Sequence, residues 1–202
     1  MALNFANNNS LSAITTKPSG LSGGSMNLIS TQTASSSSTI SFTSGIDSTY
    51  DEYVFKLYNI HPSSDSDVQL QFNGSADTGS NYNVTKTTTH FSAYHYESNL
   101  TASLGYNTSY DIAQGTGFQT LSTNIGGDND QCGSGYIHLF APSSTTFAKH
   151  FISNVSFVQS DDVARIDYVA GYFNTTSAVD AMQFKFSSGN IDSGVIKLYG
   201  IS

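Results

Sequence analysis

A heptapeptide that occurs twice constrains the fold of this 202-residue chain more than any other feature. Residues 54–60 read VFKLYNI and residues 195–201 read VIKLYGI, so five of the seven positions are identical. Both copies are rich in β-branched and aromatic residues, and neither contains proline, which is typical of strands. We therefore predict two long strands near the centre of one sheet. If the two strands are neighbours, their pairing brings the two ends of the fold together.

Alternation around the first copy predicts which side chains face the core. A strand repeats every two residues, so we expect one nearly apolar side and one side that carries a lysine. The apolar side holds Tyr53, Phe55 and Leu57. The other side holds Val54, Lys56, Tyr58 and Ile60.

The composition favours an all-β protein with a polar but weakly charged surface. Charged residues make up 11% of the chain, against about 25% in an ordinary globular protein. Aromatic residues make up 12%, which is atypical of disordered chains. Segments rich in leucine, alanine, glutamate and lysine are absent, so no helix is expected.

Charge and hydropathy also exclude several classes of function. The net charge is −8 and the seven basic residues are scattered singly, whereas nucleic-acid binding needs clustered lysine and arginine. No apolar run is long enough to span a membrane, and the N-terminus lacks a signal-peptide pattern. Cys132 is the only cysteine, so we expect no disulfide framework.

Turn residues divide the chain into an N-terminal arm and a single domain. Residues 1–27 contain few apolar side chains, several glycines and Pro18, so we predict an extended arm. Residues 28–202 form the domain, which begins with strands at 28–33 and 39–43 joined as a hairpin or by a short loop. Nine to eleven short strands are expected in all. Their spacing predicts an antiparallel β-sandwich, jelly-roll-like, with the arm attached.

No constellation of residues predicts catalysis, a cofactor or a metal site. Cys132 and His138 lie six residues apart and could form a nucleophile–base pair, but the alternative of a small buried thiol is favoured. Carboxylate pairs occur at Asp65/Asp67, Asp128/Asp130 and Asp161/Asp162, all in predicted turns where aspartate bonds its own backbone. The Asp128/Asp130 pair could supply oxygen ligands to calcium, although it lacks the downstream glutamate of an EF-hand.

Tyrosines are the most informative candidates for binding. Rings stack on sugars and neighbouring amides bond to hydroxyls, so exposed tyrosines beside asparagine could face a glycan. The alternative is that these rings pack in a thin core with their hydroxyls at its rim. The candidate glycan-facing residues are Tyr94, Tyr96, Tyr106 and Tyr110.

Four stretches of this sequence resemble a family of small structural proteins of tailed bacteriophages, best represented among phages of cyanobacteria and other aquatic bacteria. They read SLSAITTKPSGLSGG, STQTASSSSTISFTSGIDSTYDEYVFKLYNIHPSSD, GSGYIHLFAPSSTTFAKHFIS and GVIKLYGIS. The similarity covers most of the chain and is weakest at residues 73–117 and 161–192. It implies a surface-exposed virion component, either a capsid decoration protein or a tail- or fibre-associated subunit, with no catalytic residues.

The expected function is therefore a non-enzymatic structural role in a bacteriophage virion, where the subunit stabilises the particle through its contacts. Expected partners are other virion proteins and further copies of the chain, with a trimer favoured, and no nucleic acid or membrane. The alternative is a receptor- or glycan-binding module of a tail fibre that recognises a host cell-surface glycan. We expect the arm to add a strand to a neighbour's open sheet edge.

Overall fold

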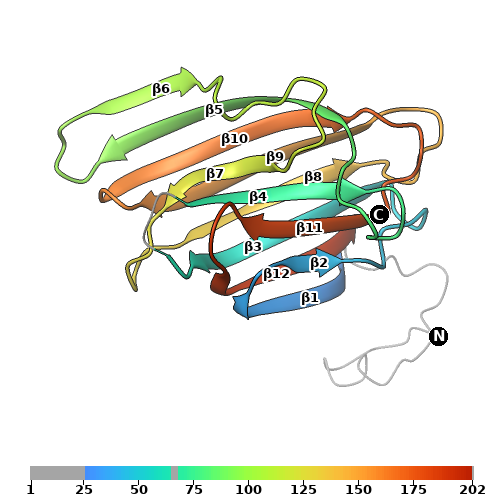
Figure 1. Ribbon diagram of the computed structural model, residues 1–202, viewed down its shortest axis with the longest axis horizontal. Helices are drawn as coiled ribbons and strands as arrows, with labels where there is room; N and C mark the ends of the chain where they lie inside the picture. Colours follow the sequence, from blue (N-terminus) through green and yellow to red (C-terminus); the bar gives the residue numbers. More distant parts are fainter. Residues whose placement is uncertain (1–25, 65–67, 202) are drawn as a thin grey trace, which may run out of the picture.

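The computed structural model describes residues 26–64 and 68–201, and these residues form twelve strands and no helix (Figure 1). The strands are β1 (Met26–Ser37), β2 (Ile40–Phe42), β3 (Glu52–Pro62), β4 (Val68–Ser75), β5 (Lys86–Tyr96), β6 (Ala102–Tyr106), β7 (Gln119–Ile125), β8 (Gly133–Phe140), β9 (Lys149–Gln159), β10 (Val163–Phe173), β11 (Ala181–Phe186) and β12 (Ile191–Ile201). The predicted all-β class is confirmed. Within the described ranges no helix is long and apolar enough to cross a membrane.

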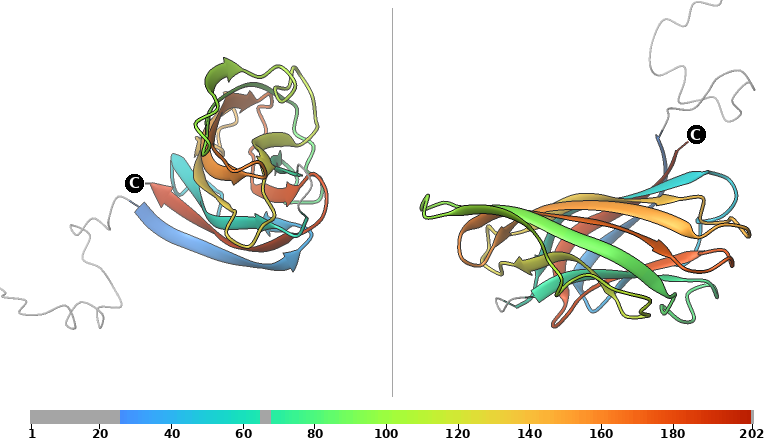
Figure 2. Two further views of the ribbon diagram at one scale, coloured as in Figure 1. Left: turned by 90° about the vertical axis from the view of Figure 1, so that its left-hand side faces the viewer. Right: turned by 90° about the horizontal axis from the view of Figure 1, so that it is seen from above.

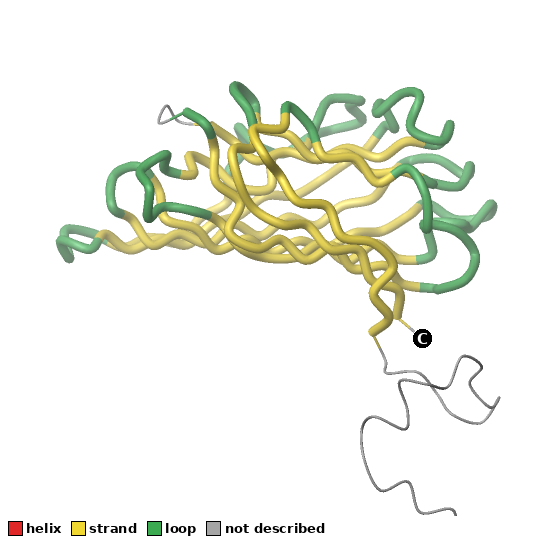
Figure 3. Tube along the Cα trace, turned by 90° about the horizontal axis from the view of Figure 1, so that it is seen from below, coloured by secondary structure: helices red, strands yellow, loops and turns green. Residues whose placement is uncertain are grey.

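All strand pairs are antiparallel, and they belong to one large sheet. The main path runs β1-β12-β3-β8-β9-β7-β4-β11-β2, and a branch leaves β9 through β10 to β5 and β6. Seen from one end, the sheet curls until it is nearly closed into a barrel (Figure 2). Loops and turns gather at the two ends of the strands (Figure 3). The predicted two-layer sandwich with jelly-roll order is not confirmed, because β9 joins the two walls into one sheet.

The two repeated heptapeptides are neighbours, as β3 and β12. Lys56 lies opposite Lys197, and the antiparallel pairing places each lysine diagonally across from the tyrosine of the other copy. The Nζ atom of Lys56 lies 5.8 Å from the centre of the Tyr199 ring, and that of Lys197 lies 5.5 Å from the Tyr58 ring. These reciprocal cation–π contacts offset the repulsion between two ammonium groups that face each other across strands.

Ile60 is fully buried, so the prediction that placed it on the lysine side of the strand is wrong. Asn59 has a φ of 50°, and the ladder between β3 and β8 shifts register between Leu57 and Ile60. The extra residue forms a bulge, which turns Ile60 back toward the core. Asparagine suits this position because its short polar side chain tolerates the left-handed region.

Two triads of phenylalanine rings fill the barrel and connect its opposite walls. The first triad joins β2, β3 and β11, with ring centroids 5.3–6.2 Å apart; it consists of Phe42, Phe55 and Phe184. The second triad joins β4, β9 and β10, with centroids 5.0–6.2 Å apart; it consists of Phe72, Phe151 and Phe173. All six rings are buried, and all six pairs have the edge-to-face or tilted geometry that aromatic rings prefer.

The N-terminal part of the described chain departs from the predicted hairpin. β1 pairs with β12 and β2 pairs with β11, so the two strands are not partners, and residues Ser35 to Ser37 continue β1 instead of forming a turn. β1 begins at Met26, within the predicted arm of residues 1–27. The rest of that arm, residues 1–25, lies outside the described residues, as do Asp65 and Asp67.

The packing of the first triad leads to a prediction about the stability of the fold. Replacing Phe55, which is fully buried, with alanine removes a ring from between two walls and leaves a cavity. We expect the free energy of unfolding to fall by about 3–5 kcal/mol. The matched control is Phe147→Ala, because this ring is 73% exposed in a loop and its loss should change stability by less than about 0.5 kcal/mol. Equal losses for the two variants in urea unfolding would contradict the assignment of the core.

Candidate functional site

Strands β5 and β10 carry all their lysine, arginine and aspartate side chains toward the barrel interior and the rings of Phe91 and Tyr168 toward solvent. Lys86 and His90 of β5 and Asp167 of β10 are fully buried. Phe91 of β5 is 40% exposed, and its cross-strand partner Tyr168 is half-buried on the same side. This polarity is the reverse of what a strand with one wet face normally shows.

The reversed strands belong to a continuous uncharged surface, which we call the outer face. It consists of alternate residues of five adjacent strands: β6 from Ala102 to Tyr106, β5 from Thr87 to His95, β10 from Ala164 to Tyr172, β9 from His150 to Val158 and β8 from Ser134 to Phe140. No aspartate, glutamate, lysine or arginine occurs at these positions. The four charged residues of the five strands all lie on the other side, at Lys86, Lys149, Arg165 and Asp167.

A ridge of aromatic rings crosses the outer face between two grooves. The rings of Phe91 and Tyr168 stack with centroids 4.8 Å apart and an angle of 8° between their planes. A groove of about 510 Å³ lies on one side and includes Ile152, which is 50% exposed. A groove of about 400 Å³ lies on the other side, over Ile166. Surfaces of this kind, depleted in charge and rich in tyrosine and phenylalanine, resemble the cores of protein interfaces.

The four tyrosines predicted to face a glycan do not share one surface. Tyr94 and Tyr96 extend from the inward side of β5, with their rings 6.0 Å apart, and Arg165 lies over the Tyr94 ring. Tyr106 lies on the outer face, and its hydroxyl donates to Asp111. Tyr110 sits in the loop after β6, with its ring 5.5 Å from that of His90. Only Tyr106 therefore belongs to the outer face.

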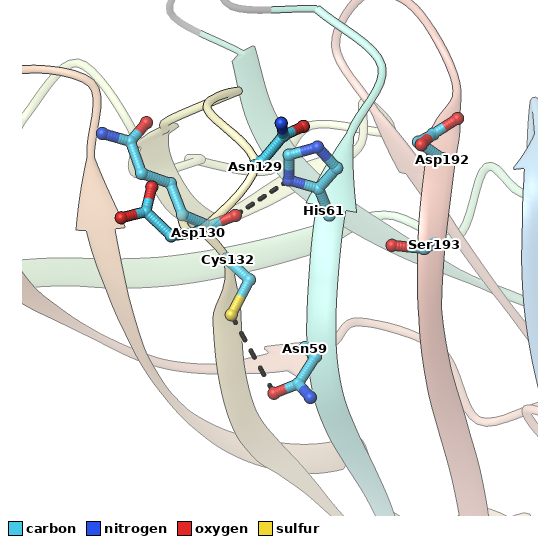
Figure 4. Close-up of a pocket in the computed structure, with 8 residues that line it drawn as sticks. Asn59, His61, Asn129, Asp130, Cys132, Asp192 and Ser193 are labelled. Atoms are coloured by element: carbon cyan, nitrogen blue, oxygen red, sulfur yellow. Dashed lines mark hydrogen bonds between the residues drawn. The ribbon is translucent and has the colours of Figure 1, made fainter.

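A polar pocket of about 400 Å³ lies at one end of the barrel, between the end of β3, the start of β12 and the turn before β8 (Figure 4). The Nδ1 atom of His61 lies 2.8 Å from the carbonyl oxygen of Gln131. Because a carbonyl only accepts, the Nδ1 atom carries a proton and donates it to this hydrogen bond. Asp130 and Asp192 also line the pocket, so it suits a ligand that donates hydrogen bonds.

Cys132 lines the same pocket and is not paired with His138. Its thiol donates to Asn59 Oδ1 at 3.9 Å, and burial raises its pKa. A raised pKa keeps the sulfur protonated at neutral pH, which is the opposite of an activated nucleophile. His138 points to the outer face, where its Nδ1 pairs with Glu52. The structure therefore does not bring together the nucleophile–base pair considered from the sequence.

A buried polar cluster fills the space beneath the reversed strands. Asp167 accepts hydrogen bonds from the amide and hydroxyl of Thr123, at 2.8 and 2.9 Å, and from Nε of Arg165 at 3.0 Å. His90 lies 3.6 Å from the same carboxylate, and burial lowers the pKa of its imidazole more than Asp167 raises it. Asp167 and His90 are fully buried, whereas the Arg165 side chain is 13% exposed. Neither ring nitrogen of His90 has a hydrogen-bond partner among the described residues, so the network around Asp167 is only partly satisfied at His90.

Two further lysines are buried on either side of Phe173. Lys86 Nζ donates to the Gly117 carbonyl at 2.6 Å, and Lys149 Nζ donates to the carbonyls of Phe147 and Thr175, each at 2.9 Å. No carboxylate of the described residues forms an ion pair with either lysine. Burial alone lowers the pKa of both, to about 8 for Lys86.

The remaining carboxylate pairs stay in turns. Asp128 and Asp130 lie between β7 and β8, and Asp161 and Asp162 lie between β9 and β10. Across the part of the chain that the structure describes, no three histidine, cysteine, aspartate or glutamate side chains converge to hold a metal ion. Within the described chain, no third side chain of these types therefore joins the Asp128/Asp130 pair.

Sequence reasoning missed the outer face, although a signal was present. Uncharged residues occupy every second position of residues 87–95, 150–158 and 164–172. The charged residues of the same strands, Lys86, Lys149, Arg165 and Asp167, occupy the alternate positions. Alternation shows that a strand has two unlike sides but does not say which of them faces the core. The usual assumption, that the charged side faces water, gives the wrong answer here.

No protein-family model matches this chain, and neither a curated protein nor a solved structure matches it. These comparisons leave the resemblance to tailed-phage structural proteins as a hypothesis.

The buried lysine predicts a dependence of stability on pH. The pKa of Lys86 is 10.5 in the unfolded chain and about 8 in the fold, so near pH 9 the unfolded chain binds a proton that the fold has released. Stability should therefore rise with pH from about 8 to about 10.5, by about 3 kcal/mol, since each unit of this difference is worth about 1.4 kcal/mol.

The variant Lys86→Met should lose this rise and unfold no more easily than the wild type at pH 7. Lys56→Met, at a half-exposed position on β3, is the matched control and should keep the wild-type profile. Chemical unfolding at pH 7.5, 9 and 10 tests the difference. An unchanged pH profile in Lys86→Met would show that Lys86 remains charged in the fold.

Proposed function

We propose that this chain is a non-catalytic structural subunit that works within a larger assembly, and that this assembly is a bacteriophage virion. The observation that carries the first part is the reversed polarity of β5 and β10, which leaves an uncharged aromatic surface facing solvent in a chain of net charge −8. Exposing such a surface costs free energy unless another surface covers it. The virion assignment rests on the sequence resemblance.

Further features of the proposal follow the expectations from the sequence. The partners are further copies of the chain, with a trimer favoured, together with other virion proteins. As to the fold, we propose that the nearly closed sheet is a jelly-roll-like sandwich of two facing walls. The phenylalanine triads pack the wall of β4, β11 and β2 against the wall of β3, β9 and β10.

The outer face is tested by placing a charge in the larger groove. Ile152→Lys introduces an ammonium group at a position that is 50% exposed, so the monomer should fold normally. In an assembly that covers the groove, the same lysine is desolvated without a partner. The dissociation constant of the assembly should therefore rise at least tenfold. Phe147→Lys, the same kind of change at an exposed loop, is the matched control.

Sedimentation velocity over a concentration series measures the effect. The expected result is an oligomer for the wild type and Phe147→Lys, and a shift toward the 21.6 kDa monomer for Ile152→Lys. A wild type that stays monomeric at every concentration, or an Ile152→Lys variant that assembles normally, would remove the structural role of this face. Copy number in purified phage particles tests the virion assignment separately.

The second candidate function is binding of a neutral glycan, and the larger groove on the outer face favours it. The groove combines the ring of Tyr172, the imidazole of His150 and the hydroxyls of Thr87 and Thr89 without a formal charge. Such a lining suits a saccharide that stacks on a ring and shares hydrogen bonds.

A glycan array tests this second function. We expect any bound neutral glycan to lose at least tenfold in affinity with Tyr172→Ala and to be unaffected by Tyr96→Ala, which lies on the inward side of β5. An array without binding, or equal effects of the two variants, would leave only the structural role.

A further inference from the structure

Among the described residues, one edge of β1 has no neighbouring strand. β1 is the last strand of the main path, and among residues 26–64 and 68–201 it pairs only with β12, along one of its two edges (Figure 1). The other edge faces away from the barrel (Figure 2). In its central part, residues 30–35, the ladder with β12 is regular, because the only shift lies between Leu28 and Ser30.

One hydrogen bond identifies the backbone groups that point outward. In an antiparallel pair, alternate residues of an edge strand direct both their N–H and C=O groups away from the neighbouring strand. The amide of Ser35 donates to the hydroxyl of Ser37 at 3.2 Å, so we assign Ser35 to the set that points outward. Thr31 and Thr33 have the same parity as Ser35, so their N–H and C=O groups also face the open edge.

β1 has one register shift, a bulge between Leu28 and Ser30, and from Ser30 to Ser37 its edge carries none of the devices that normally prevent strands from pairing. Natural edge strands are short, or they contain proline, lysine or other charged residues. β1 has twelve residues and contains no proline and no charged residue, and its exposed side chains include Leu28 at 56%. By contrast β2, at the other end of the path, has only three residues, and β6, at the end of the branch, has five.

We propose that β1 pairs antiparallel with β1 of a second copy of this chain, across a two-fold axis, so that two sheets become one. A strand edge is complementary to its own copy under a two-fold rotation, because donors and acceptors alternate along it. The uncharged edge lets two chains of net charge −8 approach without opposed charges at the contact. Thr31 and Thr33 then lie beside polar residues of the same kind, a pairing that favours neighbouring strands.

This contact uses a different surface from the outer face and does not depend on it. The proposed function requires an assembly, whereas the β1 contact specifies one interface within it. Variants of the two surfaces can therefore fail separately.

Proline at an outward-facing amide tests the contact. Thr33→Pro removes an N–H that β12 does not use, so the fold should persist, as proline is tolerated on edges. The matched control Thr33→Val keeps the N–H and the β-branched shape. In sedimentation velocity we expect Thr33→Pro to raise the dissociation constant of the β1-mediated dimer at least tenfold and Thr33→Val to leave it within about threefold. Circular dichroism confirms that both variants fold.

A cysteine scan supplies a readout that does not depend on proline. In full-length chains carrying Cys132→Ser, single cysteines at positions 30–35 are oxidised and the disulfide-linked dimer is measured. Residues directly opposite across an antiparallel pair lie about 4.5–5.5 Å apart between Cα atoms, which suits a disulfide. A two-fold axis places one residue opposite itself, so we expect cross-linking to peak sharply at one position, with or without Ile152→Lys.

The remaining outcomes overturn the proposal. An oligomeric wild type with no cross-link at any of the six positions would mean that the contact lies elsewhere, while the assembly role stands. Cross-links from these positions to residues 1–25 of a chain, located by mass spectrometry of a variant with a second cysteine there, would assign the edge to that segment. Loss of the β1 cross-link together with outer-face assembly in Ile152→Lys would mean that the two contacts are one.

Discussion

The packing of the two phenylalanine triads between opposite walls is the interaction on which the rest of this structure depends. The triads fix the distance between opposite walls of the barrel, because each triad takes rings from both walls and packs them at 5.0–6.2 Å. The repeated strands β3 and β12 then lie in the wall next to the first triad, with Phe55 inside and the Lys56–Tyr199 contact outside. Aromatic burial thus supplies the driving force where the core is apolar.

Beyond the second triad, beneath β5 and β10, the interior contains buried polar and charged side chains. Asp167, Arg165 and Thr123 form a hydrogen-bonded network under β5 and β10. Lys86 is buried with a carbonyl as its hydrogen-bond acceptor and with its Nζ atom 5.9 Å from the centre of the Phe173 ring. Burying these groups is costly even when they are bonded. The same strands leave Phe91 in solvent. A fold that buries charge and exposes rings on one pair of strands has an outer surface suited to contact with another molecule, and the composition of the core is thereby linked to the proposed function.

The sequence predicted the parts of the fold that depend on local pattern. The all-β class and the two long strands at Val54 and Val195 followed from composition and repetition. The side of the strand predicted for Ile60 was wrong, because a period-two pattern does not reveal the bulge at Asn59. The four tyrosines chosen as a glycan surface were grouped by closeness in sequence. The structure separates them, because Tyr94 and Tyr106 lie on opposite faces of the β5–β6 pair. Which face of a reversed strand is buried depends on partners far away in the chain, and alternation alone cannot supply that information.

The central claim is that the outer face of β6, β5, β10, β9 and β8 is covered by another molecule when the protein functions. Hydroxyl-radical footprinting of the full chain at low and high concentration measures this directly, since oxidation reports the exposure of individual rings. The account predicts that labelling of Phe91, Tyr136 and Tyr168 falls severalfold as the concentration rises, while labelling of Phe147 stays constant. Equal labelling of all four residues at both concentrations would contradict it.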